Sequence, residues 1–213
     1  MNLLIDFDNT WVSQETLDVL ADLCAPQIAD NVRRLTYLAM TGELSFAKAL
    51  RERVACLDID QTKIDACIAL MRQSVSSSFQ QHVETIQAHA DNIYVISGGF
   101  REIIVPIVTE FGVHPQHVFA NTFHQQAGRV VGIDTNNVLA QDQGKVTLLA
   151  SLALPRPIVM VGDGMTDYTV YAMGQADRFF AYTEHVQRTS VIAKANEQAG
   201  NIAVVLRAIG WLS

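Results

Sequence analysis

Two pairs of aspartates follow short apolar runs, and their spacing could support metal chemistry. Asp6 and Asp8 follow the run at residues 3–5, and Asp163 and Asp167 follow the run that ends in "VGDG". Side chains alternate along a strand, so Asp6 and Asp8 are expected to point to one side. Carboxylates that close repel unless a cation holds them or one stays protonated. A hard divalent cation such as Mg²⁺ would suit them, although each pair alone is also compatible with an ordinary turn.

Two further stretches offer groups that could bind an anion. "SGG", which is Ser97, Gly98 and Gly99, supplies a hydroxyl and unhindered backbone N–H groups where a helix is expected to begin. Lys145, in "QGKV", stands at another expected helix start, where the helix dipole disfavours a cation. Alone, the first stretch is also compatible with a plain strand-to-helix turn, and Lys145 with a solvated surface lysine. Together with the aspartates, they form a more specific set.

Buried strands alternating with helices must position these groups. Strand-like apolar runs occur at 3–5, at 93–96, in "PIVMVGDG" and in "DRFFAY", and "VFANTFHQQAGRVVGID" predicts a hairpin around Gly128. This alternation predicts a parallel α/β sheet, which binds ligands outside the carboxyl ends of its strands. Three of the expected strands end in "DFD", "SGG" and "GDG", so their polar groups should converge.

A long helical stretch interrupts the alternation after the first strand. It is rich in Ala, Leu, Glu, Gln and Arg, and it is too long for one ordinary crossover. We interpret it as an inserted cap. The expected fold is α/β, with a Rossmann-like parallel-sheet core formed by residues 1–13 and 77–213, and a small helical cap formed by residues 14–76.

One cap helix is expected to carry an arginine on its apolar face. Ser45 is a suitable N-cap for "FAKALRERVACL". At about 100° per residue, Arg53 falls in the middle of the apolar face and Arg51 falls on the far side. A guanidinium there needs an anionic partner, such as a substrate carboxylate bound bidentately. Solvent, or a local acid such as Glu43, is the alternative partner.

Composition restricts the classes of protein and partner. The chain has 213 residues, of which 49% are hydrophobic and 17% charged, a globular composition. A net charge of −7 argues against nucleic acid or an anionic membrane as partner, but not against an anionic substrate. Three cysteines without paired spacing, no secretory leader and no apolar run of membrane-spanning length lead us to expect a cytoplasmic protein. The oligomeric state stays open.

The polar motifs also resemble those of a known family. "DFDNT", "SGG", Lys145 and "GDGMTD", in this order, resemble the four motifs of the haloacid dehalogenase (HAD) superfamily of phosphotransferases. Within it the chain resembles the phosphoserine phosphatases, through "WVSQET", "AMTGELSFAKALRERV", "SGGF" and "VFANTF". The resemblance covers most of the chain. It implies a Mg²⁺-dependent hydrolase of phosphoserine, a reaction of serine biosynthesis, with a small phosphomonoester as partner.

The resemblance implies roles for the aspartates. Asp6 attacks phosphorus and forms an aspartyl phosphate. Asp8 serves as general acid toward the leaving alkoxide and then as base toward water. The metal site combines the Asp6 carboxylate, the Asp8 backbone carbonyl and Asp163, and Asp167 supports it.

The resemblance also implies two groups of binding residues. The phosphate is bound or its loop held by Thr10, Ser97, Gly98 and Lys145. The rest of the substrate is recognised by an ammonium-binding glutamate, two apolar residues that close over the site and a carboxylate-binding arginine, which are Glu15, Met40, Phe46 and Arg53.

Two other functions are compatible with the sequence. One is a different small-molecule phosphatase or phosphotransferase of the same superfamily, because the cap sets specificity. The other is a non-hydrolytic phospho-acceptor module, since signalling receivers also combine clustered aspartates, a hydroxyl and a lysine on a parallel sheet. Asp8 as a candidate acid and the cap argue against the acceptor module. Sustained phosphate release from p-nitrophenyl phosphate would separate the two.

Overall fold

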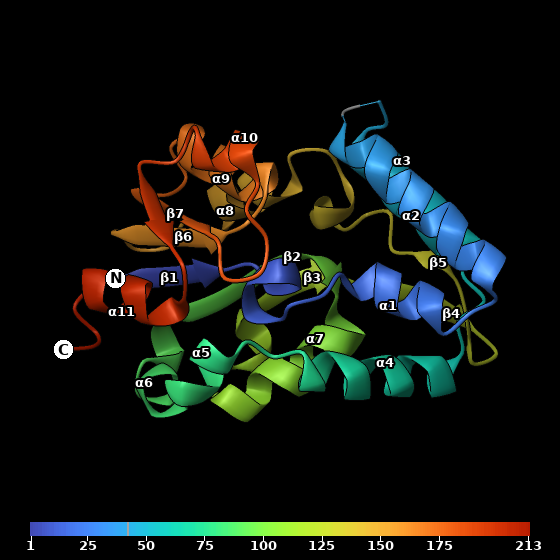
Figure 1. Cartoon of the computed structure of the whole chain (residues 1–213), viewed down its shortest axis with the longest axis horizontal. Coiled ribbons are helices and arrows are strands. Elements are labelled where there is room, and N and C mark those ends of the chain that lie inside the picture. The colour runs from blue at the N-terminus through green and yellow to red at the C-terminus, as the bar shows by residue number, and fades with distance from the viewer. Residues whose placement is uncertain (42) are drawn as a thin grey trace.

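A six-stranded parallel sheet forms the centre of the molecule (Figure 1). The computed structural model describes residues 1–41 and 43–213, and of Met40 the backbone alone. The strand order is β3-β2-β1-β6-β7-β8, and every neighbouring pair is parallel. The six strands are β1 (Asn2–Ile5), β2 (Ile93–Phe100), β3 (Val118–Asn121), β6 (Ile158–Gly162), β7 (Arg178–Tyr182) and β8 (Glu197–Ala199).

Helices cover both faces of this sheet (Figure 1). One face carries α8 (Gly144–Leu152), α9 (Met165–Ala172) and α10 (Thr189–Ile192). The other carries α5 (Ser77–Gln81), α6 (Val83–Ala88), α7 (Arg101–Val108) and α11 (Ile202–Ala208). Among the described residues, no helix combines the length and apolar character needed to cross a membrane.

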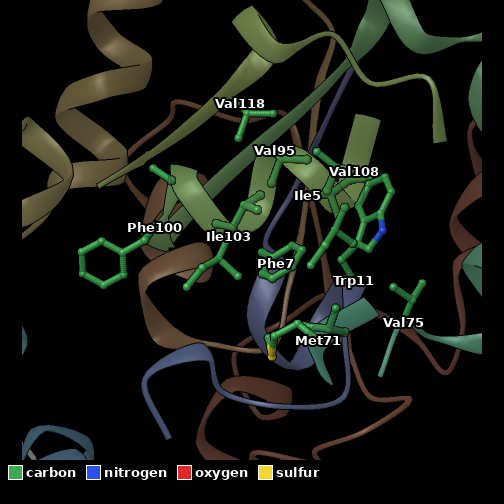
Figure 2. Close-up of a cluster of buried hydrophobic side chains, with 14 of the residues drawn as sticks. Ile5, Phe7, Trp11, Met71, Val75, Val95, Phe100, Ile103, Val108 and Val118 are labelled. Carbon is green, nitrogen blue, oxygen red and sulfur yellow. The ribbon is translucent and has the colours of Figure 1, made fainter. Parts of the chain in front are cut away.

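The two faces of the sheet bury separate apolar clusters. Leu3 and Ile5 belong to the cluster on the α7 side, whereas Leu4 belongs to the cluster on the α8 side, as alternation along a strand requires. Figure 2 shows part of the first cluster, in which Trp11 lies beside β1. The Trp11 ring lies 4.4 Å from that of Phe79, centroid to centroid. Burial on both faces is typical of parallel sheets and confirms the predicted α/β class.

Four helices lie between β1 and the return of the chain to the sheet. They are α1 (Thr16–Asp22), α2 (Pro26–Met40), α3 (Phe46–Cys56) and α4 (Gln61–Gln73). The first three pack in succession, and α4 lies against α7 (Figure 1). An antiparallel hairpin of β4 (Phe123–Gln126) and β5 (Arg129–Ile133) contacts α3, and it confirms the hairpin predicted around Gly128.

The chain leaves and rejoins the sheet region at adjacent points. Val12 and Val75 form an isolated antiparallel bridge. The Ser13 N–H donates a hydrogen bond to the Ser74 carbonyl at 2.8 Å. Val12 with Val75 and Ser13 with Ser74 are two adjacent contacts between the same two chain segments. We call these two segments, residues 12–13 and 74–75, the hinge pair. The chain segments at the two ends of the helical insertion are thus hydrogen-bonded to each other.

Candidate active site

The strand order brings three strand ends together beside β1. The chain builds outward from β1 to β2 and β3 on one side, then to β6, β7 and β8 on the other. Such a switch point opens a crevice at the carboxyl ends of the strands. A cavity of about 510 Å³ lies there, lined by Asp6, Ser97 and Asp163 from the sheet and by Glu15 and Arg53 from the insertion. The predicted convergence of polar strand ends is present.

Asp6 and Asp8 are positioned by a turn. The strand ends at Ile5, and residues 7–12 form a turn that is closed by a hydrogen bond from the Val12 N–H to the Phe7 carbonyl at 3.2 Å. The backbone inside this turn is not helical: Asp8 is extended and Asn9 has a left-handed φ of 54°. The Asp6 Oδ1 accepts a hydrogen bond from the Phe7 N–H at 2.7 Å. Both carboxylates do line the cavity, but the predicted reason, alternation along a strand, is wrong. The chain turns too sharply there for strand geometry.

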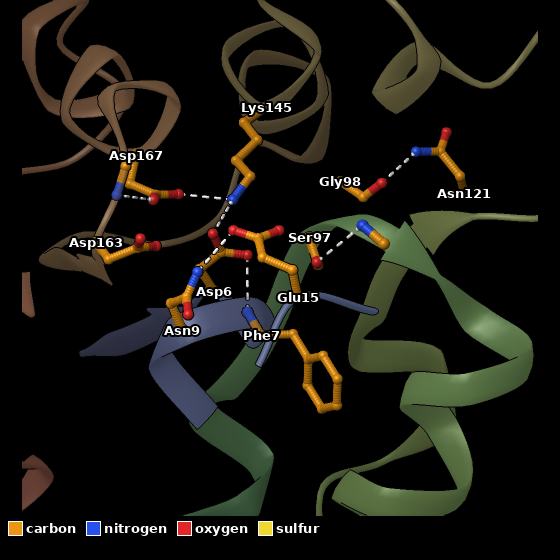
Figure 3. Close-up of polar contacts among 12 residues, drawn as sticks. Asp6, Phe7, Asn9, Glu15, Ser97, Gly98, Asn121, Lys145, Asp163 and Asp167 are labelled. Atoms are coloured by element: carbon orange, nitrogen blue, oxygen red, sulfur yellow. Dashed lines mark hydrogen bonds and ion pairs between the residues drawn. The ribbon is translucent and has the colours of Figure 1, made fainter. Parts of the chain in front are cut away.

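Lys145 joins two of the aspartates (Figure 3). Its Nζ lies 2.9 Å from Asp6 Oδ2 and 2.6 Å from Asp167 Oδ1, and the side chain is buried, so it is not a solvated surface lysine. Burial alone would lower the pKa of Lys145, but the two carboxylates outweigh burial and raise it. Asp167 packs so closely on the end of β6 that a Cβ at Gly162 would lie 2.3 Å from its Cγ. A glycine is required at that position.

Asp163 is paired with a residue that the sequence did not single out. Arg188 Nε donates a hydrogen bond to Asp163 Oδ2 at 2.7 Å, and its Nη2 lies 3.5 Å from Glu15 Oε1. Arg188 lies between β7 and α10, in a loop with no periodic pattern. It therefore brings a further cation to the rim of the cavity.

Three aspartates form a group suited to a metal ion. One carboxylate oxygen from each of Asp6, Asp163 and Asp167 lies within 4.8 Å of the others, and all three residues are buried. Oxygen donors of this kind match the preference of a hard divalent cation. Burial raises the pKa of both Asp163 and Asp167, and the charge of Asp6 raises it further, so a bound cation would stabilise the ionised forms. Among the described residues, the carboxylate of Asp8 does not belong to this group. This does not conflict with the prediction, which assigned the metal to the backbone carbonyl of Asp8.

The Asp8 carboxylate is held from the insertion. Thr16 Oγ1 donates a hydrogen bond to Asp8 Oδ1 at 2.5 Å. Oδ2 lies on the side of Gly99, 3.8 Å from where a Cβ on that glycine would stand. Burial, followed by the charge of Glu15, raises the pKa of Asp8 well above its usual value. A raised pKa favours the protonated form of the carboxyl group, which is the form that a general acid needs.

The Ser97–Gly99 segment lies within the last part of β2, just before Phe100, and lines the cavity. The helix α7 begins two residues beyond Gly99, so the segment precedes the helix and is not its first turn. A Cβ at Gly98 would lie 2.9 Å from the Phe46 ring, so a larger residue there would require the ring to move. The Gly98 carbonyl accepts a hydrogen bond from Asn121 Nδ2 at 3.0 Å (Figure 3). Asn121 is a second contributor that sequence reasoning missed.

Two residues that were predicted to belong to the site, Thr10 and Met40, are not among the described residues that line the cavity. Thr10 is fully buried and does not line the cavity, and its hydroxyl has no hydrogen-bond partner within the described part of the chain. Its carbonyl instead accepts a hydrogen bond from Ser76 Oγ at 3.0 Å, so its backbone supports the loop. The side chain of Met40 lies outside what the structure describes.

Glu15 faces the cavity immediately before α1. Its Oε1 accepts a hydrogen bond from Asn9 Nδ2 at 2.6 Å. Burial, followed by the charge of Asp163, raises the pKa of Glu15 to about 7. The carboxyl therefore changes its ionisation within the neutral range.

Arg53 also faces the cavity, from α3. Only 8% of the residue is exposed, and its Nη1 lies 3.3 Å from Thr36 Oγ1. Arg51 is exposed on the opposite side of the same helix. The predicted helical phase is confirmed.

The start of α3 contacts the sheet domain at two points. The Phe46 ring lies over Gly98 and lines the cavity. The Ala47 N–H donates a hydrogen bond to Asp142 Oδ1 at 3.0 Å. These contacts hold the arginine-bearing helix over the aspartates.

Comparison with known proteins identifies the family. Residues 3–171 match the family model of the haloacid dehalogenase-like hydrolases. The chain is 30% identical to the phosphoserine phosphatase of Homo sapiens over 190 residues, covering 87% of this chain and 83% of that one. It is 29% identical to the chloroplastic phosphoserine phosphatase of Arabidopsis thaliana over 195 residues, covering 90% of this chain but spanning 65% of that relative.

A solved structure of a phospho-aspartyl intermediate analogue of phosphoserine phosphatase has the same fold. Its TM-score is 0.79 at 26% identity, and the match covers 97% of each chain. The predicted family and fold class are both confirmed. This chain belongs to the haloacid dehalogenase-like hydrolases, and within them to the family of the phosphoserine phosphatases.

Proposed function

We propose that this chain is a Mg²⁺-dependent phosphomonoester hydrolase that works through an aspartyl phosphate on Asp6, with phosphoserine as its substrate. The observation that carries the proposal is the position of Asp6, at the carboxyl end of β1, 2.9 Å from Lys145 and grouped with Asp163 and Asp167. The relatives named above support the choice of phosphoserine.

The first step is attack by Asp6. A carboxylate oxygen of Asp6 forms a bond to phosphorus as the bond between phosphorus and the substrate oxygen breaks. Lys145 and Ser97 would bind phosphoryl oxygens, whose charge grows in the transition state. A Mg²⁺ ion held by Asp6, Asp163 and the Asp8 carbonyl, with Asp167 in support, would neutralise charge on the transferring group.

The second carboxyl moves the proton in both halves of the reaction. Asp8 gives its proton to the leaving oxygen, which departs as the alcohol, and Asp8 is left as the carboxylate. It then takes a proton from the water that attacks phosphorus. The bond between phosphorus and Asp6 breaks, which releases phosphate and restores both carboxyl groups. The raised pKa of Asp8 supports its role as the initial acid.

The cap residues account for the rest of the substrate. Arg53 would bind the carboxylate bidentately, and Glu15 would bind the ammonium. Phe46 and Met40 would close over the site. Both charged residues line the same cavity as Asp6, which supports one substrate that carries all three groups.

We further propose that residues 1–13 and 77–213 act as the core and residues 14–76 as a cap. The hinge pair supports this division, because its hydrogen bonds mark where the chain crosses between the two parts. The hydrogen bond between Ala47 and Asp142 supports closure of the cap onto the core.

A phosphate-release screen with Mg²⁺ tests the proposal. We expect kcat/KM to be highest for phosphoserine among phosphorylated amino acids, sugars and nucleotides, and phosphate release from p-nitrophenyl phosphate to be sustained. If phosphoserine is no better than a sugar phosphate, the substrate assignment is wrong while the hydrolase survives. A single stoichiometric burst without turnover would instead favour a phospho-acceptor module.

A further inference from the structure

We propose that Thr16 is a positioning residue for the reaction: its contact with Asp8 Oδ1 turns the other carboxyl oxygen, Oδ2, toward the phosphate-binding segment. This inference rests on the proposed acid–base role of Asp8. Thr16 is the first residue of α1 and is fully buried, so its side chain has no alternative orientation in solvent.

Thr16 engages one particular oxygen of the carboxyl group. Its hydroxyl donates to Asp8 Oδ1 at 2.5 Å. An oxygen that already accepts a hydrogen bond is a poor place for a proton, because the donor occupies one of its lone pairs. Oδ2 is therefore the atom that carries and transfers the proton.

Oδ2 faces the position where the phosphoryl group would bind. The point where a Cβ on Gly99 would stand lies 3.8 Å from Asp8 Oδ2 and 3.3 Å from Ser97 Oγ. Asp8 Oδ2 and the Ser97 hydroxyl thus flank the same glycine. Rotation of the Asp8 carboxyl would instead turn the engaged oxygen to that side, so the Thr16 contact selects the productive orientation.

A second hydrogen bond lies directly beside the first and does not involve Asp8. Asn9 Nδ2 donates to Glu15 Oε1 at 2.6 Å (Figure 3). Asn9 follows Asp8 in the catalytic loop, and Glu15 precedes Thr16 at the start of the insertion. Both bonds therefore tie the same loop to the same helix, but only the Thr16 bond reaches Asp8. Asn9→Gly, which removes the side-chain amide and tolerates the left-handed φ of this residue, is a matched control for general loosening of this junction.

The test compares two aryl phosphates that differ in the leaving group. p-Nitrophenyl phosphate hardly needs a proton on departure, whereas phenyl phosphate does. Thr16→Val keeps the side-chain shape and the backbone N–H but removes the hydroxyl. We expect it to lower kcat/KM for phenyl phosphate about tenfold and that for p-nitrophenyl phosphate less than about twofold. Thr16→Ser should restore phenyl phosphate hydrolysis, and Asn9→Gly should change kcat/KM for both substrates by the same factor.

A double-mutant cycle with Asp8→Asn separates this inference from the proposed function. In the Asp8→Asn background, Thr16→Val should cause no further loss with phenyl phosphate, because the acid is already absent. If Asp8→Asn impairs both aryl phosphates equally, the acid role fails and the inference falls with it. If Asp8→Asn shows the selective loss but Thr16→Val does not, or Thr16→Ser fails to restore activity, the role of Thr16 is overturned and the acid role stands.

Discussion

Replacing Arg53 with alanine should remove recognition of the substrate carboxylate. Arg53 is 8% exposed and lines the same cavity as Asp6, so its contact with a bound carboxylate would be largely desolvated. Loss of one partner of such a charge pair costs about 2–5 kcal/mol. Because the cavity also admits water, we take the lower part, about 2–3 kcal/mol. At about 1.36 kcal/mol per factor of ten, kcat/KM for phosphoserine should fall about 30- to 150-fold.

The assay needs two controls: a substrate that differs from phosphoserine only in lacking the carboxylate, and a variant that removes a neighbouring arginine of the same helix. Phosphoethanolamine keeps the ammonium and the phosphate but lacks the carboxylate, so its kcat/KM should change little in Arg53→Ala. Loss of the arginine also removes a positive charge that lowers the pKa of Glu15, but this affects both ammonium substrates and cancels in their ratio. Arg51→Ala, two residues away and exposed, should leave the ratio unchanged.

Two outcomes would contradict this reasoning. If Arg53→Ala weakened both substrates equally, Arg53 would support the cap and not bind the carboxylate. If Arg51→Ala were the more damaging change, the side of α3 assigned to the substrate would be wrong. A thermal melt of each variant shows whether loss of activity reflects loss of the fold.

Three further outcomes are expected. Asp6→Asn should abolish phosphate release, while its melting temperature stays within a few degrees of that of the wild type. Excess chelator should abolish phosphate release by the wild type. Full activity in either case would contradict the mechanism. The pKa of Glu15 is raised to about 7, so its ammonium-binding carboxylate form increases as pH rises. The KM for phosphoserine, relative to that for glycerol phosphate, should therefore fall between about pH 6 and 8, and a ratio independent of pH would refute this. Gly162→Ala places a Cβ 2.3 Å from Asp167 Cγ and should destabilise the fold by about 1–3 kcal/mol in chemical denaturation, whereas an unchanged midpoint would mean that Asp167 moves freely.

The centre of the site was predictable because each group lies near or just beyond the carboxyl end of a buried strand. Parallel strands that end in polar residues must present them at one edge, so the strand pattern predicts that Asp6, Ser97 and Asp163 meet, as they do around the cavity. Arg53 was predictable for another reason, since helical phase distinguishes it from Arg51. Both inferences depend on patterns within one element.

The missed residues depend on contacts between distant segments. Arg188 meets Asp163 and Glu15 from an irregular loop, and Asn121 reaches Gly98 from the next strand. No local period marks such contacts. Taken alone, Lys145 was compatible with a solvated surface lysine, because the local sequence does not contain its partners. The two carboxylates that pair with it in the buried site come from other elements. The orientation of Asp8 depends on an irregular turn with a left-handed Asn9, and such a turn has no sequence signature as clear as alternation.

The hinge pair has a consequence for how members of this fold could diverge. Because Ser13 and Ser74 are joined by a 2.8 Å hydrogen bond, the two ends of the insertion lie side by side in the folded chain. The entropic cost of closing a loop rises only with the logarithm of its length, so a longer or shorter insertion would change the stability of the sheet by about 0.6 kcal/mol per doubling. Selection can therefore exchange the inserted segment as a module while the strand ends that carry Asp6 and Asp163 stay unaltered.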